Sequence, residues 1–138
     1  MGEGDRIQWR GVRPVNPEEI FTRFEPPHGC YYVDAQASGG VGERTVYTVP
    51  ANEMFYMTSL GFSCYGTANG TGYFRIYNTT PAVHRHLFSL QVESGRGQNI
   101  NVNFNIAMQL PALYTVRIES GIAGVNVVGY VVGYTRDV

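Results

Sequence analysis

The sequence predicts an all-β fold, an antiparallel β-sandwich, and three observations support this. From Val46 to the end of the chain, apolar and polar residues alternate with a period of two. Gly, Asn and Pro interrupt this alternation at intervals typical of turns between short strands. The chain of 138 residues is also long enough for one domain with a substantial core.

Residues 1–44 differ from the rest, and we expect them to form an extended N-terminal arm. They hold four of the seven Pro and show no sustained alternation. The run Asn16-Pro17-Glu18-Glu19 predicts the start of a helix, with Asn as N-cap and a Glu that completes a capping box. The helix is expected near 17–24, because Pro26 and Pro27 cannot continue it. Two turns are unstable alone, so its apolar residues must pack against the chain's own sandwich or a neighbour: Ile20, Phe21 and Phe24.

The remaining residues, 45–138, are expected to form the sandwich domain. Before it, Tyr31-Tyr32-Val33 could form a short strand, and residues 37–42 are rich enough in Gly to predict a flexible joint. Seven or eight strands separated by turn residues are typical of a jelly roll. The strands predicted within the domain are 45–49, 53–64, 72–78, 85–92, 100–108, 113–119 and 124–135.

The residue patterns of two of these strands predict which of their side chains are buried. In the clearest alternation, three Asn lie on one face of the strand. The other face carries five bulky side chains: Ile100, Val102, Phe104, Ile106 and Met108. At roughly 1.5–3 kcal/mol for each buried side chain, this strand would supply a large part of the core. The last strand, Val125 to Tyr134, is apolar on both faces. That pattern predicts a place in the centre of a sheet or at a subunit contact.

The distribution of charge bears on function. Seven of the 11 acids and five of the ten Arg lie in the first 44 residues, so the last 94 residues carry nine charges. A free monomer usually keeps more charge on its surface, so we expect other subunits to cover much of the sandwich. A net charge of −1 with no basic run argues against nucleic-acid binding. The sequence has no apolar stretch of membrane-spanning length and no signal peptide, so we expect no membrane partner and an origin in the cytoplasm.

No arrangement of residues predicts an enzyme. His84-Arg85-His86 puts two imidazoles on one face of a strand, a geometry that can chelate a metal. Cupins, which are jelly-roll enzymes, use such a pair, but their motif also needs a Gly six residues before it and a Glu shortly after it. Here position 78 is Asn and the next acid is Glu93, so we predict no catalytic residue, metal or cofactor. Cys30 and Cys64 are expected to be free thiols, since they could pair only if the arm folds back onto the sandwich.

The ten Tyr fit two kinds of binding surface. Exposed aromatic rings can stack on sugar rings, and Tyr is also a favoured residue of protein interfaces. Because the domain carries so little charge, we favour a protein interface and keep glycan binding as the alternative. The predicted subunit interface is in the last strand: Tyr130, Val132 and Tyr134.

Two segments give the chain a resemblance to a known group. Thr48 to Leu60 resembles a pattern in β-sandwich structural proteins of tailed phages and other viruses, in which Val-Pro-Ala and a polar turn precede a strand rich in aromatic and hydroxyl residues. The run Val127 to Tyr134 is similar to the final Gly-Tyr strand of that group. In layout, with its N-terminal arm, the chain is closest to phage capsid decoration (cementing) proteins, which form jelly-roll trimers on the capsid.

This resemblance implies a virion structural protein, made in the host cytoplasm, that stabilises a shell as a homotrimer. Its partners would be copies of itself and the major capsid protein or other virion proteins. The arm would dock apolar anchors and charged rim residues on an adjacent subunit or on the capsid: Trp9, Ile20, Phe21, Phe24, Arg6, Arg10, Arg13 and Arg23. Deletion of residues 1–40 is then expected to leave a folded sandwich that no longer binds its shell. The alternative is a receptor- or glycan-binding head of a phage tail fibre.

Overall fold

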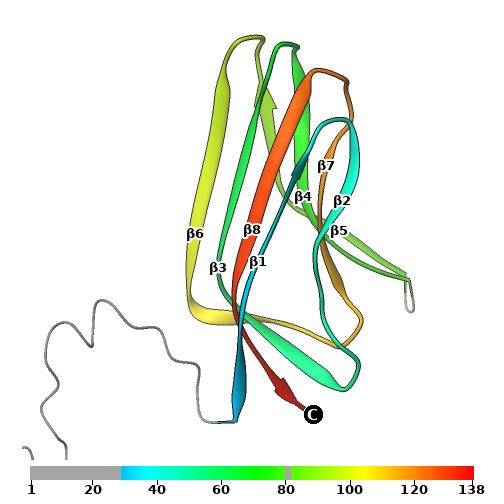
Figure 1. Cartoon of the computed structure of the whole chain (residues 1–138), viewed down its shortest axis with the longest axis vertical. Helices are drawn as coiled ribbons and strands as arrows, with labels where there is room; N and C mark the ends of the chain where they lie inside the picture. The colour runs from blue at the N-terminus through cyan, green and yellow to red at the C-terminus, as the bar shows by residue number, and fades with distance from the viewer. Residues whose placement is uncertain (1–28, 80–81) are drawn as a thin grey trace, which may run out of the picture.

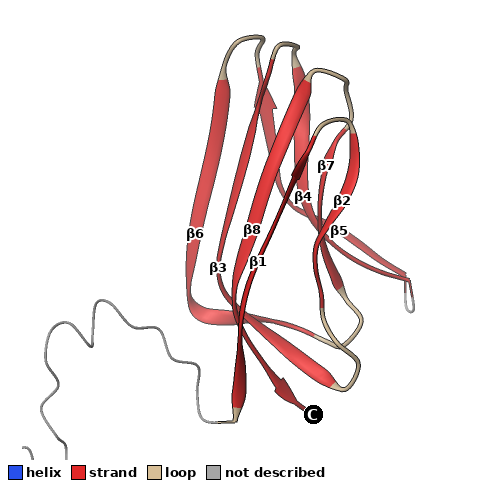
Figure 2. Ribbon diagram, viewed as in Figure 1, coloured by secondary structure: helices blue, strands red, loops and turns tan. Residues whose placement is uncertain are grey.

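A computed structural model of the chain describes residues 29–79 and 82–138. The helix predicted near 17–24 and all the predicted arm anchors lie outside the described residues. Within them the chain is all-β and contains no helix, as Figure 2 shows. Its strands are β1 (Cys30–Gly39), β2 (Gly42–Thr48), β3 (Glu53–Gly66), β4 (Gly70–Thr79), β5 (Ala82–Val92), β6 (Gly97–Leu110), β7 (Thr115–Ser120) and β8 (Val125–Asp137).

The strands form two four-stranded antiparallel sheets that pack face to face as a β-sandwich (Figure 1). Sheet A has the order β1-β8-β3-β6, and sheet B has the order β2-β7-β4-β5. The first strand pairs with the last, the second with the seventh, the third with the sixth and the fourth with the fifth. The first four strands therefore pair with the last four in reverse order, and the four pairs are divided equally between the two sheets.

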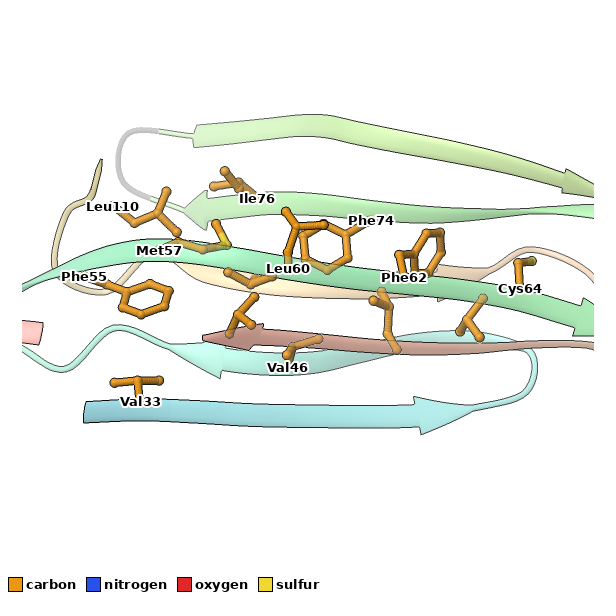
Figure 3. Packing of buried hydrophobic residues seen from close by; sticks show 14 of the residues in the cluster. Val33, Val46, Phe55, Met57, Leu60, Phe62, Cys64, Phe74, Ile76 and Leu110 are labelled. Carbon is orange, nitrogen blue, oxygen red and sulfur yellow. The ribbon is translucent and has the colours of Figure 1, made fainter. Parts of the chain in front are cut away.

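The core lies between the sheets and is built from the inward residues of each strand (Figure 3). Phe62 of sheet A and Phe74 of sheet B meet edge to face at its centre, with ring centroids 5.7 Å apart. Beside them a Cβ on Gly129 would lie 2.7 Å from Ile118 Cγ2, so the absence of a side chain there lets the two sheets approach. Burial of this apolar surface is the main stabilising term of the fold.

All seven predicted strands of the domain are confirmed, in order, with bounds that differ by a few residues. The central position predicted for the last strand is also confirmed, because β8 lies between β1 and β3. Residues 30–44, assigned to the arm by the sequence, form β1 and the start of β2. The prediction of a flexible joint at 37–42 was wrong, because Gly40 and Val41 alone separate the two strands.

The prediction for Ile100 to Met108 was only partly right. The segment lies in β6, which is an edge strand of sheet A, so its inward side chains are half-buried. Residues 104–107 oppose Thr58 alone, and this bulge breaks the alternation. Ile106, placed in the core by the sequence, is 86% exposed.

The two cysteines are free. They pair in register with Arg136 and Val127 of β8, which are nine residues apart. At about 3.4 Å per residue this separates Cys30 from Cys64 by about 30 Å, whereas the Cα atoms of a disulfide lie within about 7 Å. This distance excludes a disulfide within one chain. Burial raises the pKa of the Cys64 thiol, and a hydrogen bond with the backbone of Gly72 partly offsets this.

Candidate interaction surfaces

The outer face of sheet A is one broad surface, which we call the sheet A face. Successive side chains of a strand point to opposite sides of a sheet, and β8 shows this as a strict alternation of buried and half-buried residues. The two sheets are the only layers in the described part of the chain, so no third layer of it covers this face. The face consists of Tyr32, Asp34, Gln36, Ser38, Tyr56, Ser59, Gly61, Ser63, Asn99, Asn101, Asn103, Val128, Tyr130, Val132 and Tyr134.

A row of tyrosines crosses the sheet A face near the start of β1 and the end of β8. Tyr32, Tyr134 and Tyr56 are in register on three neighbouring strands. The rings of Tyr56 and Tyr134 stack with centroids 4.9 Å apart and planes 15° from parallel. Such contacts hold large side chains in fixed positions before any partner arrives.

A fourth tyrosine lies flat on the same face. A Cβ on Gly61 would come within 2.0 Å of Tyr130 Cε1, so the ring of Tyr130 covers this glycine on the neighbouring strand. The Tyr130 hydroxyl donates a hydrogen bond to Asn101 Oδ1, 3.1 Å away on β6. Glycine is needed at position 61 because any side chain would lift the ring from the sheet. The centre of the sheet A face is thus both aromatic and flat.

The sheet A face carries almost no charge. Asp34 on the edge strand β1 and Arg136 at the end of β8 are the charged residues on the outer side of sheet A, and both lie at its rim. Four strands about 4.8 Å apart and ten residues long give a flat area of about 600 Å². Aromatic enrichment and depletion of charge are the composition found at the buried centres of protein interfaces.

The outer face of sheet B has the opposite character, because charged residues occupy its centre. Arg75 is buried there and donates to Glu43, while its Nη1 lies 3.0 Å from Glu119 Oε1. Arg117 lies 3.0 Å from Glu43 Oε1, and its guanidinium carbon is 4.1 Å from the ring centroid of Tyr77. We call Glu43, Arg75, Arg117 and Glu119 the sheet B network. Its two positive and two negative charges are paired within the chain.

The electrostatics of Glu43 reflect this pairing. Burial alone would raise the pKa of its carboxyl group, but the hydrogen bond and charge of Arg75, together with those of Arg117, hold the pKa below its usual value. Glu43 therefore stays ionised through the neutral range. Sequence reasoning missed this network, since its members come from three strands and show no local motif.

The residues predicted for the subunit interface fall on one surface. Tyr130, Val132 and Tyr134 all point outward from β8 and form the middle of the sheet A face. Of the His-x-His pair, His86 stacks on Tyr73 with ring centroids 4.7 Å apart. In residues 29–79 and 82–138, no group of three or more His, Cys, Asp or Glu is placed to hold a metal ion. That part of the chain also has no helix with the length and apolar character needed to span a membrane.

No protein-family model matches this chain, and no curated protein matches it either. The surfaces themselves therefore carry the functional argument. The described chain offers the uncharged sheet A face and the self-paired sheet B network. It also offers a hollow beside the loops that join β3 to β4 and β5 to β6.

This hollow, which we call the polar hollow, has a volume of about 600 Å³. It lies between the β4–β5 pair and the connection from β5 to β6. The amide of Asn69 accepts a hydrogen bond from the backbone N–H of Ser94, which ties two of the bordering loops together. Its polar lining consists of Asn69, Thr71, Gln91, Glu93, Arg96 and Gln98.

Proposed function

We propose that this protein is a virion structural protein, a capsid decoration protein that assembles as a homotrimer through the sheet A face. The single observation that carries the proposal is the composition of that face, which is broad, rich in tyrosine and uncharged except at its rim. Tyrosine is enriched and charge is depleted at the buried centres of protein interfaces. Binding of sister copies would remove this surface from water.

The proposal includes a jelly-roll topology for the sandwich. The pairing of β1 with β8, β2 with β7, β3 with β6 and β4 with β5 supports it, because a jelly roll is an antiparallel double sheet of eight strands. The two segments that resemble phage and viral sandwich proteins fall largely on β3 and β8. These strands are hydrogen-bonded neighbours and carry the middle of the sheet A face.

An arm would add to the area that the face can bury. A stable interface buries about 800 Å² of accessible surface on each partner, and the sheet A face covers about 600 Å² in projection. Contacts by residues 1–28 with a neighbouring subunit or with the capsid would extend this interface. The partners are therefore copies of this chain and a capsid or other virion protein, and the location is the virion.

Light scattering at increasing concentration tests the proposal, and a compact trimer is the expected result. Val132→Lys places a charge in the middle of the face, next to Asp34, which can pair with it in the free subunit. We expect the dissociation constant of the assembly to rise at least about 100-fold, because the charge must be buried on association. Ser89→Lys, on the exposed outer face of sheet B, is the matched control and should leave the mass unchanged. A monomer at high concentration would exclude the proposal.

Truncation tests the role of the N-terminal segment, but not as the sequence alone indicated. Deletion of residues 1–40 would remove the whole of β1, an edge strand of sheet A, and with it the fold of that edge. Deletion of residues 1–28 leaves every described strand in place. This shorter variant is expected to stay folded and to bind the shell more weakly than the full chain does.

A second candidate is a glycan-binding head of a tail fibre, and the polar hollow is the observation that favours it. Its amides, carboxylate and guanidinium can hydrogen-bond the hydroxyl groups of a sugar. Saturable binding on a glycan array, weakened by Gln98→Ala, would support this function. An array without signal, together with a trimer in solution, would favour decoration.

A further inference from the structure

A second apolar surface lies at the edge of the sandwich, between strands β5 and β6. We call it the β5–β6 groove; its volume is about 410 Å³. Its apolar lining comes from Ile76, Leu87, Met108, Leu110, Pro111 and Tyr114. Figure 1 shows the lower half of the β4–β5 hairpin turning away from β6 at this level.

Two irregularities explain why the groove is open. The register of β4 with β5 shifts at Phe74, where Leu87 is the extra residue. The register of β3 with β6 shifts opposite Thr58, at residues 104–107. A bulge bends its strand and increases the local twist, so the two strands that border the gap diverge. The inward side chains below the bulges are left without the opposite sheet edge to close over them.

We propose that the β5–β6 groove binds the N-terminal segment 16–25 of a second copy of this chain. The segment carries Ile20, Phe21 and Phe24, spaced at one and four residues so that a helix would present them as one stripe. An amphipathic helix with such anchors is one of the recurring ligands of an apolar groove. This inference rests on the proposed function, since it needs neighbouring copies side by side.

The charges of segment and groove are complementary. Arg85 is the one charged residue that lines the groove. The segment contains Glu18, Glu19 and Glu25 but only one Arg, Arg23, so its net charge is −2. Opposite charges at the rim of an apolar contact orient the ligand and speed its association.

The position of the segment in the chain allows a second copy to be its donor. Twenty-eight residues precede Gly29, which adjoins the start of β1, and β1 and β6 are opposite edges of sheet A. Copies placed side by side bring the β1 edge of one next to the β6 edge of the other. Phe21 is eight residues from Gly29, a reach of up to about 28 Å, whereas one strand spacing is about 4.8 Å. The segment can therefore cross to the next copy, and such head-to-tail contacts close a ring.

Disulfide trapping in the full chain tests this inference. In a Cys30→Ser background, the variant Phe21→Cys/Leu87→Cys is oxidised and its products are separated under denaturing conditions. The expected result is covalent products of two and three chains. The matched control is Phe21→Cys/Ser89→Cys, because Ser89 lies on the same strand but on the outer face of sheet B. The control should give at most about one tenth of that product.

A cross-link within a single chain would overturn the inference, because it would make the chain's own segment the occupant. Absence of any cross-link, or equal yields from the Leu87 and Ser89 variants, would overturn it as well. Light scattering on the same unoxidised samples separates this failure from that of the proposed function. A trimer without the cross-link leaves the sheet A face as the interface and removes only the groove, whereas a monomer removes both.

Discussion

The two outer faces of this sandwich differ in where they carry charge. Both belong to four-stranded antiparallel sheets that share one core, so the needs of folding are similar for each. Sheet B places two Arg and two Glu at its centre and pairs them within the chain. Sheet A places tyrosines, small residues and amides there: the rings of Tyr56 and Tyr134 stack on each other, and the ring of Tyr130 lies over Gly61. A face with charges in its middle suits water, and one without them suits a protein partner.

The largest effect expected on stability comes from breaking the sheet B network at its centre. Arg75→Met leaves Glu43 and Glu119 directly opposite each other on β2 and β7 without their shared cation. Removal of one partner from a fully buried ion pair costs about 3–5 kcal/mol. Both carboxylates are partly exposed and Glu43 keeps its contact with Arg117, so we expect about 2 kcal/mol here. Urea unfolding at neutral pH measures this.

The exposed pair of Glu93 and Arg96 provides the control for that change. Both side chains are about three-quarters exposed, with charged atoms 3.9 Å apart. Arg96→Met should therefore alter the free energy of unfolding by less than about 0.5 kcal/mol. Equal losses from the two variants would mean that the sheet B network adds nothing beyond ordinary surface charge.

The second prediction uses pH to distinguish the faces. The pKa of Glu43 is lowered in the folded state, so its contribution to stability is present above the pKa of the unfolded chain and is lost as the pH falls through the folded pKa. The loss therefore occurs below about pH 4.5, the usual pKa of a Glu carboxyl group. Urea midpoints between neutral pH and about pH 3 measure it.

Glu43→Gln is the variant that assigns this pH dependence. It keeps the shape of the side chain but cannot titrate, so its unfolding free energy should fall less with acid than that of the original chain. The same slope in both proteins would show that other carboxylates cause the acid response.

The sequence predicted strands well because a period of two is a local property. It found only the part of β1 at Tyr31 to Val33, because the next inward residues, Ala35 and Ala37, are too small and too weak in strand propensity to stand out. It also overstated the burial of β6. Alternation tells which side chains share a face, but not whether the strand is central or at an edge, and the bulge at residues 104–107 has no local signal.

The surfaces were also predictable only where their residues follow a local pattern. Tyr130, Val132 and Tyr134 could be assigned to one face of their strand because side chains alternate regularly along it. The sheet B network could not, because Glu43 and Arg75 are 32 residues apart and meet only through the order β2-β7-β4. The β5–β6 groove depends on two bulges and on the divergence of two sheet edges, which only the three-dimensional structure reveals.

The smallest expected effects test whether the flatness of the sheet A face matters. In Gly61→Ala the new methyl group must displace the Tyr130 ring, which can move outward into solvent. We therefore expect a loss of less than about 1 kcal/mol in unfolding free energy, but an assembly about tenfold weaker, since the raised ring keeps the partner from close contact. Tyr130→Phe leaves the ring flat and removes only its hydrogen bond to Asn101.

That second variant should change the unfolding free energy by about 0.5 kcal/mol at most and the dissociation constant by no more than about threefold. Light scattering on the two variants decides between shape and hydrogen bonding as the property that a partner recognises. If Tyr130→Phe weakens the assembly as much as Gly61→Ala does, the partner binds the hydroxyl group and not the flat ring. The difference between the two faces would then lie in their hydrogen-bonding groups as well as in their charge.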